Sequence, residues 1–211
     1  NLFQNSLPLH PYIIIVLCLI AKQRFGQNER SIFSFLASAE PAALREYSEI
    51  KGTEIPRFFT LDRLFDYIQI NLGRSIMAVE GLGQRWSDAI ECVVRSEQIS
   101  QNAIVVCKVV AMVEVFEREF NLVATDELIF SALPHIEAIA LEAAIADLKE
   151  KSVIEYRNFK GGYALSLGSD IDLDSELAKA RSNLSIDDIG TDFTKVANIM
   201  PVIAGRHYHE M

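Results

Sequence analysis

The stretch IEAIALEAAIADLKEKSVIEYRNFKGGYALSL, residues 136–167, decides the fold that we predict for this chain. Apolar residues recur at helical spacing in its first half and predict an amphipathic helix over residues 136–151. The alternating run VIEYR then predicts a strand, NFKGG a turn and YALSL a returning strand. The buried stripe expected for the helix consists of Ile139, Leu141, Ala144, Ile145 and Leu148.

Two more helices are predicted just upstream of this stretch. Residues 102–118 are strongly apolar and predict a buried helix. Thr125 is a suitable N-cap for the short helix DELIFSAL, which Pro134 ends. Helix, short helix, longer helix and β-hairpin is the order of a winged helix-turn-helix, which we place at residues 101–168.

The sequence before residue 101 predicts a bundle of helices. Residues 11–24 predict a first helix, Asn28 is a suitable cap for a second, and Thr60 for a third that Gly73 ends. The predicted fold is therefore mainly α. It has a helical bundle over residues 1–100, a winged helix-turn-helix with a small β-hairpin over residues 101–168, and a helical tail over residues 169–211.

Composition restricts the classes of partner. The 211 residues carry a net charge of −9, and an acidic chain binds nucleic acid poorly because phosphate contacts need Lys and Arg. The apolar run at residues 12–21 is about half of the roughly 20 residues that a membrane-spanning helix needs, so we expect a buried helix and no membrane partner. Cys18, Cys92 and Cys107 lie in apolar runs and predict buried, reduced thiols in a cytoplasmic protein.

Four phrases resemble one family. These are PLHP (8–11), FGQNERSIFSFLAS (25–38), TLDRLFDYI (60–68) and YALSLGSDID (163–172). They resemble the region that follows the nucleotide-binding core in large bacterial P-loop ATPases of the AAA+ and origin-recognition type, many of them associated with phage defence. The family pattern has an aromatic and an acidic residue before GSDID, where this chain has Ser166 and Leu167.

The resemblance implies a helical lid beside an ATPase core of the same polypeptide, followed by a winged helix. It also implies that Arg30 senses the terminal phosphates of the nucleotide, with Asn28 beside it. The sequence contains no GxxxxGK[ST] loop, so ATP and Mg²⁺ would belong to the core and this chain alone would have no cofactor and no catalytic residue. The chain opens without Met, and we expect it to be a fragment. From the residues alone, a structural salt bridge at a helix start, with Glu29 beside it, explains Arg30 better than a nucleotide contact does.

DNA contact is a further hypothesis. A DNA-reading winged helix inserts its last helix into the major groove, but residues 136–151 carry four acidic and two basic residues and no Arg, Asn or Gln. The predicted hairpin is more suitable, because Arg157, Asn158 and Lys160 lie at its turn. DNA is therefore a disfavoured partner, and a protein partner or a homo-oligomer is preferred.

No metal site is predicted. Asp170 and Asp172 resemble the paired acids of metal-dependent nucleotidyltransferases, but Gly168 and Ser169 abut them and leave no room for a phosphate-binding helix start. We interpret these aspartates as a helix cap and solvated turn. His207 and His209 lack an acidic or cysteine partner at metal-binding spacing.

Three functions remain open from the sequence. The favoured one is the lid and winged-helix part of a multidomain ATP-binding protein, which couples nucleotide state to a protein or DNA partner. The alternatives are a stand-alone winged-helix DNA-binding regulator and, with less support, a metal-dependent nucleotidyltransferase.

Overall fold

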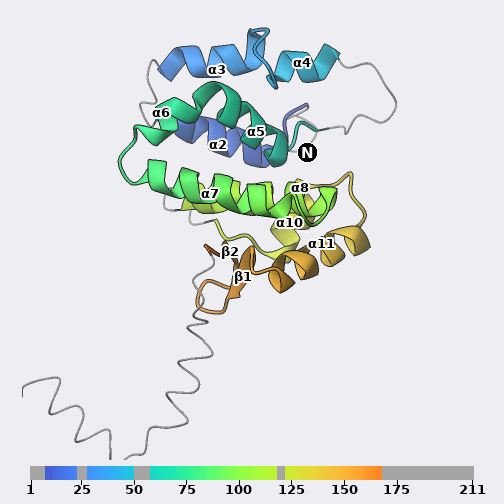
Figure 1. The fold of residues 1–211 in the computed structure, drawn as a ribbon. Coiled ribbons are helices and arrows are strands. Elements are labelled where there is room, and N and C mark those ends of the chain that lie inside the picture. The colour runs from blue at the N-terminus through green and yellow to red at the C-terminus, as the bar shows by residue number, and fades with distance from the viewer. Residues whose placement is uncertain (1–7, 23–27, 50–57, 118–121, 168–211) are drawn as a thin grey trace, which may run out of the picture. The chain divides into compact units, whose positions relative to one another are not determined.

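A computed structural model describes residues 8–22, 28–49, 58–117 and 122–167. The described chain is mainly helical with one small antiparallel sheet of two strands, as predicted (Figure 1). The described residues all belong to one compact unit. The predicted helical tail over residues 169–211 lies outside the described residues.

Helix α8 (Gln101–Val115) lies at the centre of this unit. Its apolar residues occupy nearly every face, and a helix of that kind is stable only when neighbours cover it on all sides. Ser100 caps its start, because the Ser100 hydroxyl accepts a hydrogen bond from the Ala103 backbone N–H at 3.1 Å. Helices α5, α7, α10 and α11 and strand β2 all pack against α8.

The chain before α8 is a succession of helices, several of them short. They are α2 (Pro11–Lys22), α3 (Asn28–Ala37), α4 (Leu44–Glu49), α5 (Leu61–Tyr67), the π-helix η1 (Ile68–Leu72), α6 (Gly73–Met77) and α7 (Leu82–Ser96). The helical run does not stop at Gly73. That residue has right-handed helical angles, φ −52° and ψ −43°, and begins α6.

The chain after α8 forms α10 (Asp126–Ala132), α11 (Ala138–Glu150), β1 (Ile154–Arg157) and β2 (Gly162–Leu165). The predicted cap is confirmed, because the Thr125 hydroxyl accepts a hydrogen bond from the Leu128 N–H at 3.2 Å. The two strands pair antiparallel, with Ile154 opposite Leu165 and Arg157 opposite Gly162.

Two glycines shape the hairpin. Gly161 has φ of +71°, a left-handed conformation that L side chains rarely adopt. A Cβ on Gly162 would lie 2.4 Å from the Val123 side chain and 2.9 Å from the Ala124 carbonyl oxygen. The close approach at Gly162 allows the Tyr163 N–H to donate to the Ala124 carbonyl at 2.9 Å, so residues before α10 also pair with β2.

One cluster of buried apolar residues runs from Ile13 to Leu165 and includes side chains from both sides of residue 100. The division into two domains at that point remains a prediction. Among the described helices, none has the length and apolar character needed to cross a membrane. Cys92 and Cys107 are buried as predicted, but Cys18 is exposed, because α2 turns it away from the core.

The predicted buried stripe of α11 is wrong at one position. Leu141, Ala144, Ile145 and Leu148 are buried, but Ile139 is 78% exposed. The four buried residues follow the helical spacing i, i+3, i+4, i+7, whereas Ile139 lies about 200° around the helix from Leu141. Ile139 therefore belongs to the outer face of α11.

Candidate functional site

Arg95 joins α7 to the hairpin and to the end of α11. Its guanidinium donates hydrogen bonds to the Ser166 carbonyl at 2.7 Å and to the Ser152 carbonyl at 2.8 Å. The last carbonyls of a helix have no partner within the helix, and the planar fork of arginine suits several acceptors at once. Ser152 has φ of +51°, so its backbone turns sharply out of α11 toward β1. One side chain thus fixes three elements together.

Glu114 of α8 holds the same end of β2 from the other side. Its carboxylate accepts a hydrogen bond from the Leu165 N–H at 2.5 Å. Burial raises the pKa of the Glu114 carboxyl, and the Leu165 N–H and the cations of Arg157 and Lys160 counteract part of this rise. The hairpin is therefore attached to α7 through Arg95 and to α8 through Glu114.

Both cations of the hairpin are paired with acids. Lys160 lies 2.6 Å from Glu117, and these side chains are only 21% and 30% exposed. Arg157 lies 2.7 Å from Glu155 and also donates to the Leu165 carbonyl at 3.4 Å. Three residues were predicted to contact DNA. Asn158 is exposed, whereas Arg157 and Lys160 form ion pairs with Glu155 and Glu117.

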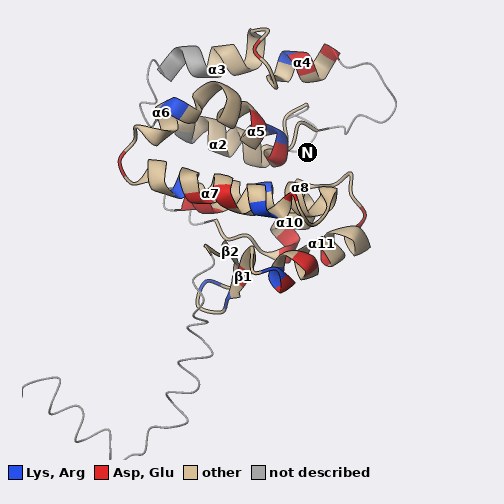
Figure 2. Cartoon of the chain, viewed as in Figure 1, with Lys and Arg blue, Asp and Glu red and all other residues tan. Residues whose placement is uncertain are grey.

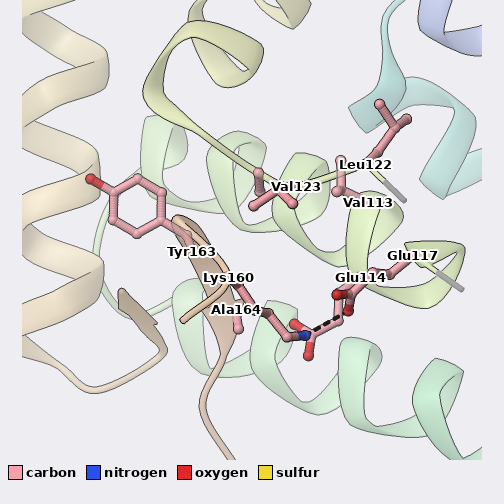
Figure 3. Close-up of a pocket in the computed structure, with 9 residues that line it drawn as sticks. Val113, Glu114, Glu117, Leu122, Val123, Lys160, Tyr163 and Ala164 are labelled. Carbon is pink, nitrogen blue, oxygen red and sulfur yellow. Dashed lines mark hydrogen bonds and ion pairs between the residues drawn. The ribbon is translucent and has the colours of Figure 1, made fainter. Parts of the chain in front are cut away.

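A small, shallow hollow lies beside these ion pairs (Figure 3). Lys160 reaches along it toward the carboxylates of Glu114 and Glu117, whereas the Tyr163 ring points away from them. The Tyr163 hydroxyl donates instead to Asp126 at 3.0 Å. The hollow is thus occupied at its polar end by the protein's own cation. Its lining residues are Val113, Glu114, Glu117, Leu122, Val123, Ala124, Lys160, Tyr163 and Ala164.

Aromatic side chains mark the outside of the hairpin. Phe159, at the turn, is 81% exposed, and Tyr156 on β1 is 43% exposed. The Tyr156 and Tyr163 rings pack edge to face with centroids 5.3 Å apart, which stiffens the hairpin. The exposed side chains near the turn of the hairpin are therefore aromatic (Tyr156 and Phe159) and amide (Asn158), whereas its two cations are partly buried.

The outer face of α11 is acidic with an apolar centre. Figure 2 shows acidic residues recurring along α11, with basic residues only near its end. Glu142 and Asp147 are exposed and make no ion pair with any described residue. Glu150 has Lys151 at 4.0 Å, with both side chains largely exposed. The charge that was predicted to repel DNA therefore faces outward.

The other predicted site residues are not brought into this region. Asn28 and Arg30 lie in α3, and their side chains are outside the described part of the structure. Asp170, Asp172, His207 and His209 also fall outside the described residues. Within residues 8–22, 28–49, 58–117 and 122–167, no three His, Cys, Asp or Glu side chains gather as a metal site would require.

Sequence reasoning missed Arg95, Glu114 and Glu117. Arg95 and Ser166 are 71 residues apart, and a polar residue on an exposed-looking helix position gives no local sign of such a partner. Glu114 interrupts the apolar run of α8, and a charge inside a buried helix is the signal that could have identified it.

Comparisons with protein-family models, with curated proteins and with solved structures gave no match.

Proposed function

We propose that this chain is the helical lid and winged-helix part of a multidomain ATP-binding protein, and that it transmits the nucleotide state of an ATPase core to a protein partner. The observation that carries the proposal is the attachment of the hairpin and α11 to α7 through Arg95. A unit fixed at several points moves with its neighbour as one body, which is what transmission of a motion requires.

The winged-helix part of the proposal is supported by the order of elements. Helices α8, α10 and α11 are followed by an antiparallel hairpin, and the Ala124–Tyr163 bridge adds a short third pairing before α10. In a winged helix-turn-helix, α11 would be the last helix and residues 158–161 the wing. Its acidic surface favours protein over DNA as the partner.

ATP and Mg²⁺ would be held by the core and not by this chain. The sequence contains no phosphate-binding loop, and no described cluster of acids would hold a divalent ion. The lid assignment rests on the family resemblance of residues 8–172, and Arg30 would be the lid residue nearest the nucleotide. No chemical step is assigned to the residues of this chain.

The test joins the chain to the nucleotide-binding core that the resemblance implies. The chain alone should not hydrolyse ATP, and the joined protein should. A fluorophore at Asn158→Cys, paired with one in the core, should report a change of distance between the ATP and ADP states. Arg95→Ala should reduce that change by at least half while hydrolysis continues. A joined protein with no hydrolysis, or a wing that ignores nucleotide, would refute the proposal.

A further inference from the structure

We infer that the outer face of α11 is a docking surface for a basic amphipathic helix of a partner protein. We call this surface the α11 face and define it as Ile139, Glu142, Ala143, Ala146, Asp147 and Glu150. The inference names the partner's chemistry and rests on the proposed coupling role only in taking the partner to be a protein.

A row of exposed side chains, apolar except at its last residue, runs along the middle of the α11 face. Ile139, Ala143, Ala146 and Glu150 follow one another at spacings of four, three and four residues, so they form a row along the helix. The row spans about 16 Å at 1.5 Å per residue, the length of about three helical turns. Ile139 is 78% exposed, and the two alanines allow another backbone to approach closely.

The charge beside this row is mainly negative, and Lys149, near the end of the helix, is the one basic residue within α11. Glu142 flanks it on one side and Asp147 on the other, and neither forms an ion pair within the described chain. Glu150 ends the row with only the exposed Lys151 at 4.0 Å. A partner that covers Ile139 must therefore supply cations on both sides of an apolar stripe, which is the pattern of a basic amphipathic helix.

Other occupants fit this charge less well. A second copy of the chain would place acids against acids if two α11 faces met about a two-fold axis. Duplex DNA would meet the same negative charge with its phosphates. The described cations nearest the turn of the hairpin, Arg157 and Lys160, are already paired with Glu155 and Glu117. Charge complementarity thus selects a basic protein segment.

The experiment uses a defined probe and the full chain. The probe is a fluorescent helical peptide of about 14 residues, with Leu at positions i, i+4, i+7 and i+11 and Lys on both flanks of that stripe. Anisotropy at moderate salt should show saturable binding. Ile139→Asp should weaken it at least about tenfold, and so should the pair Glu142→Lys and Asp147→Lys.

Matched variants test whether peptide binding requires the α11 face or arises from general attraction between a basic peptide and an acidic protein. Ile70→Asp changes another exposed isoleucine, and the pair Glu80→Lys and Glu97→Lys makes the same charge change on other exposed positions. These should alter peptide binding less than about twofold. All changes are at exposed positions, so unfolding in urea should remain within about 0.5 kcal/mol of the parent chain.

Several results would overturn the inference. These are absence of peptide binding, equal weakening by the control variants, and shifts of backbone amide resonances that fall outside α11 when peptide is added. Sedimentation that shows a dimer abolished by Ile139→Asp would assign the face to a second copy instead. The assay needs neither core nor nucleotide, so its failure leaves the coupling proposal standing, and failure of the coupling test leaves this assay interpretable.

Discussion

The Nζ of Lys160 lies 2.6 Å from the Oε2 of Glu117, so an acid two residues after the end of α8 neutralises a cation of the hairpin. Both side chains are mostly shielded from water, and breaking such a pair leaves a charge uncompensated in a poorly solvated place. Arg157 is held in a similar way by Glu155. We therefore expect the hairpin to bind phosphate weakly, although Arg157 and Lys160 are residue types that contact phosphates.

Removal of the two acids should therefore increase DNA binding. We expect the parent chain to bind a short duplex weakly at low salt, and the double variant Glu117→Gln/Glu155→Gln to bind it at least about threefold more tightly, because two cations become available to phosphates. Fluorescence anisotropy with a labelled duplex measures this.

The matched control is Glu80→Gln/Glu97→Gln, which removes the same charge from other exposed positions. If both double variants gain equally, net charge alone governs DNA binding and the ion pairs of the hairpin are irrelevant to it. If the parent chain already binds tightly and loses binding in Lys160→Ala, DNA becomes the preferred partner.

Arg95 should contribute measurably to stability. Its guanidinium satisfies two carbonyls at 2.7 and 2.8 Å and is only partly exposed, so Arg95→Ala should lower the free energy of unfolding by about 2 kcal/mol. Arg95→Lys should recover less than half of the loss, because one ammonium group cannot reach both acceptors with the same geometry. Urea denaturation gives both values.

Arg74 on α6 provides the comparison, since it is exposed and makes no ion pair with any described residue. Arg74→Ala should change the free energy of unfolding by less than about 0.5 kcal/mol. Equal effects of the two alanine substitutions would mean that Arg95 does not fix the hairpin to α7.

Local signals explain why much of the fold was predictable. Thr125 caps α10 through its own hydroxyl, and Gly161 takes up the left-handed angle of the hairpin turn. Each of these depends on residues within a few positions, so the sequence displays them directly. The order of helices and the β-hairpin followed from such features.

The errors had different causes, and only some of them depended on distant parts of the chain. Ile139 was placed in the buried stripe because it is apolar, although its angular position around the helix puts it on the outer face. Cys18 was expected to be buried because its neighbours are apolar, but α2 is covered on one side only. The join at Arg95 could not be predicted, because its acceptors are backbone carbonyls far away along the chain.

Cysteine reactivity should reveal these different environments. Burial raises the pKa of the Cys92 thiol to about 11 and that of the Cys107 thiol to about 12, so both remain protonated and shielded at pH 8. Cys18 is exposed. Iodoacetamide should therefore modify one cysteine of the folded chain within minutes and all three in urea, as counted by mass spectrometry.

The variant Cys18→Ser should leave the folded chain unmodified over the same period. Rapid modification of Cys92 in that variant would show that α7 separates readily from the end of β2, since the Cys92 thiol lies 3.5 Å from the Ser166 carbonyl.

Glu114 should make stability depend on pH in the direction opposite to that of most surface acids. Burial raises the pKa of the Glu114 carboxyl above its ordinary value of 4.5, so at pH values between the unfolded and folded pKa the folded chain holds a proton that the unfolded chain has released. The stability contributed by protonated Glu114 is fully present below the unfolded pKa and is lost as the pH rises through the folded pKa. Arg157, Lys160 and Glu117 also face Glu114 and influence its pKa.

The variant Glu114→Gln isolates this contribution. A glutamine still offers an oxygen to the Leu165 N–H and does not titrate, so the difference in unfolding free energy between parent and variant should shift in favour of the variant as the pH rises from 4 toward neutrality. Glu91→Gln, at an exposed position of α7, should show no such trend. A difference that is flat with pH, or that favours the parent increasingly as the pH rises, would mean that the Glu114 carboxylate is stabilised by Lys160, Arg157 and the Leu165 N–H more than it is penalised by burial.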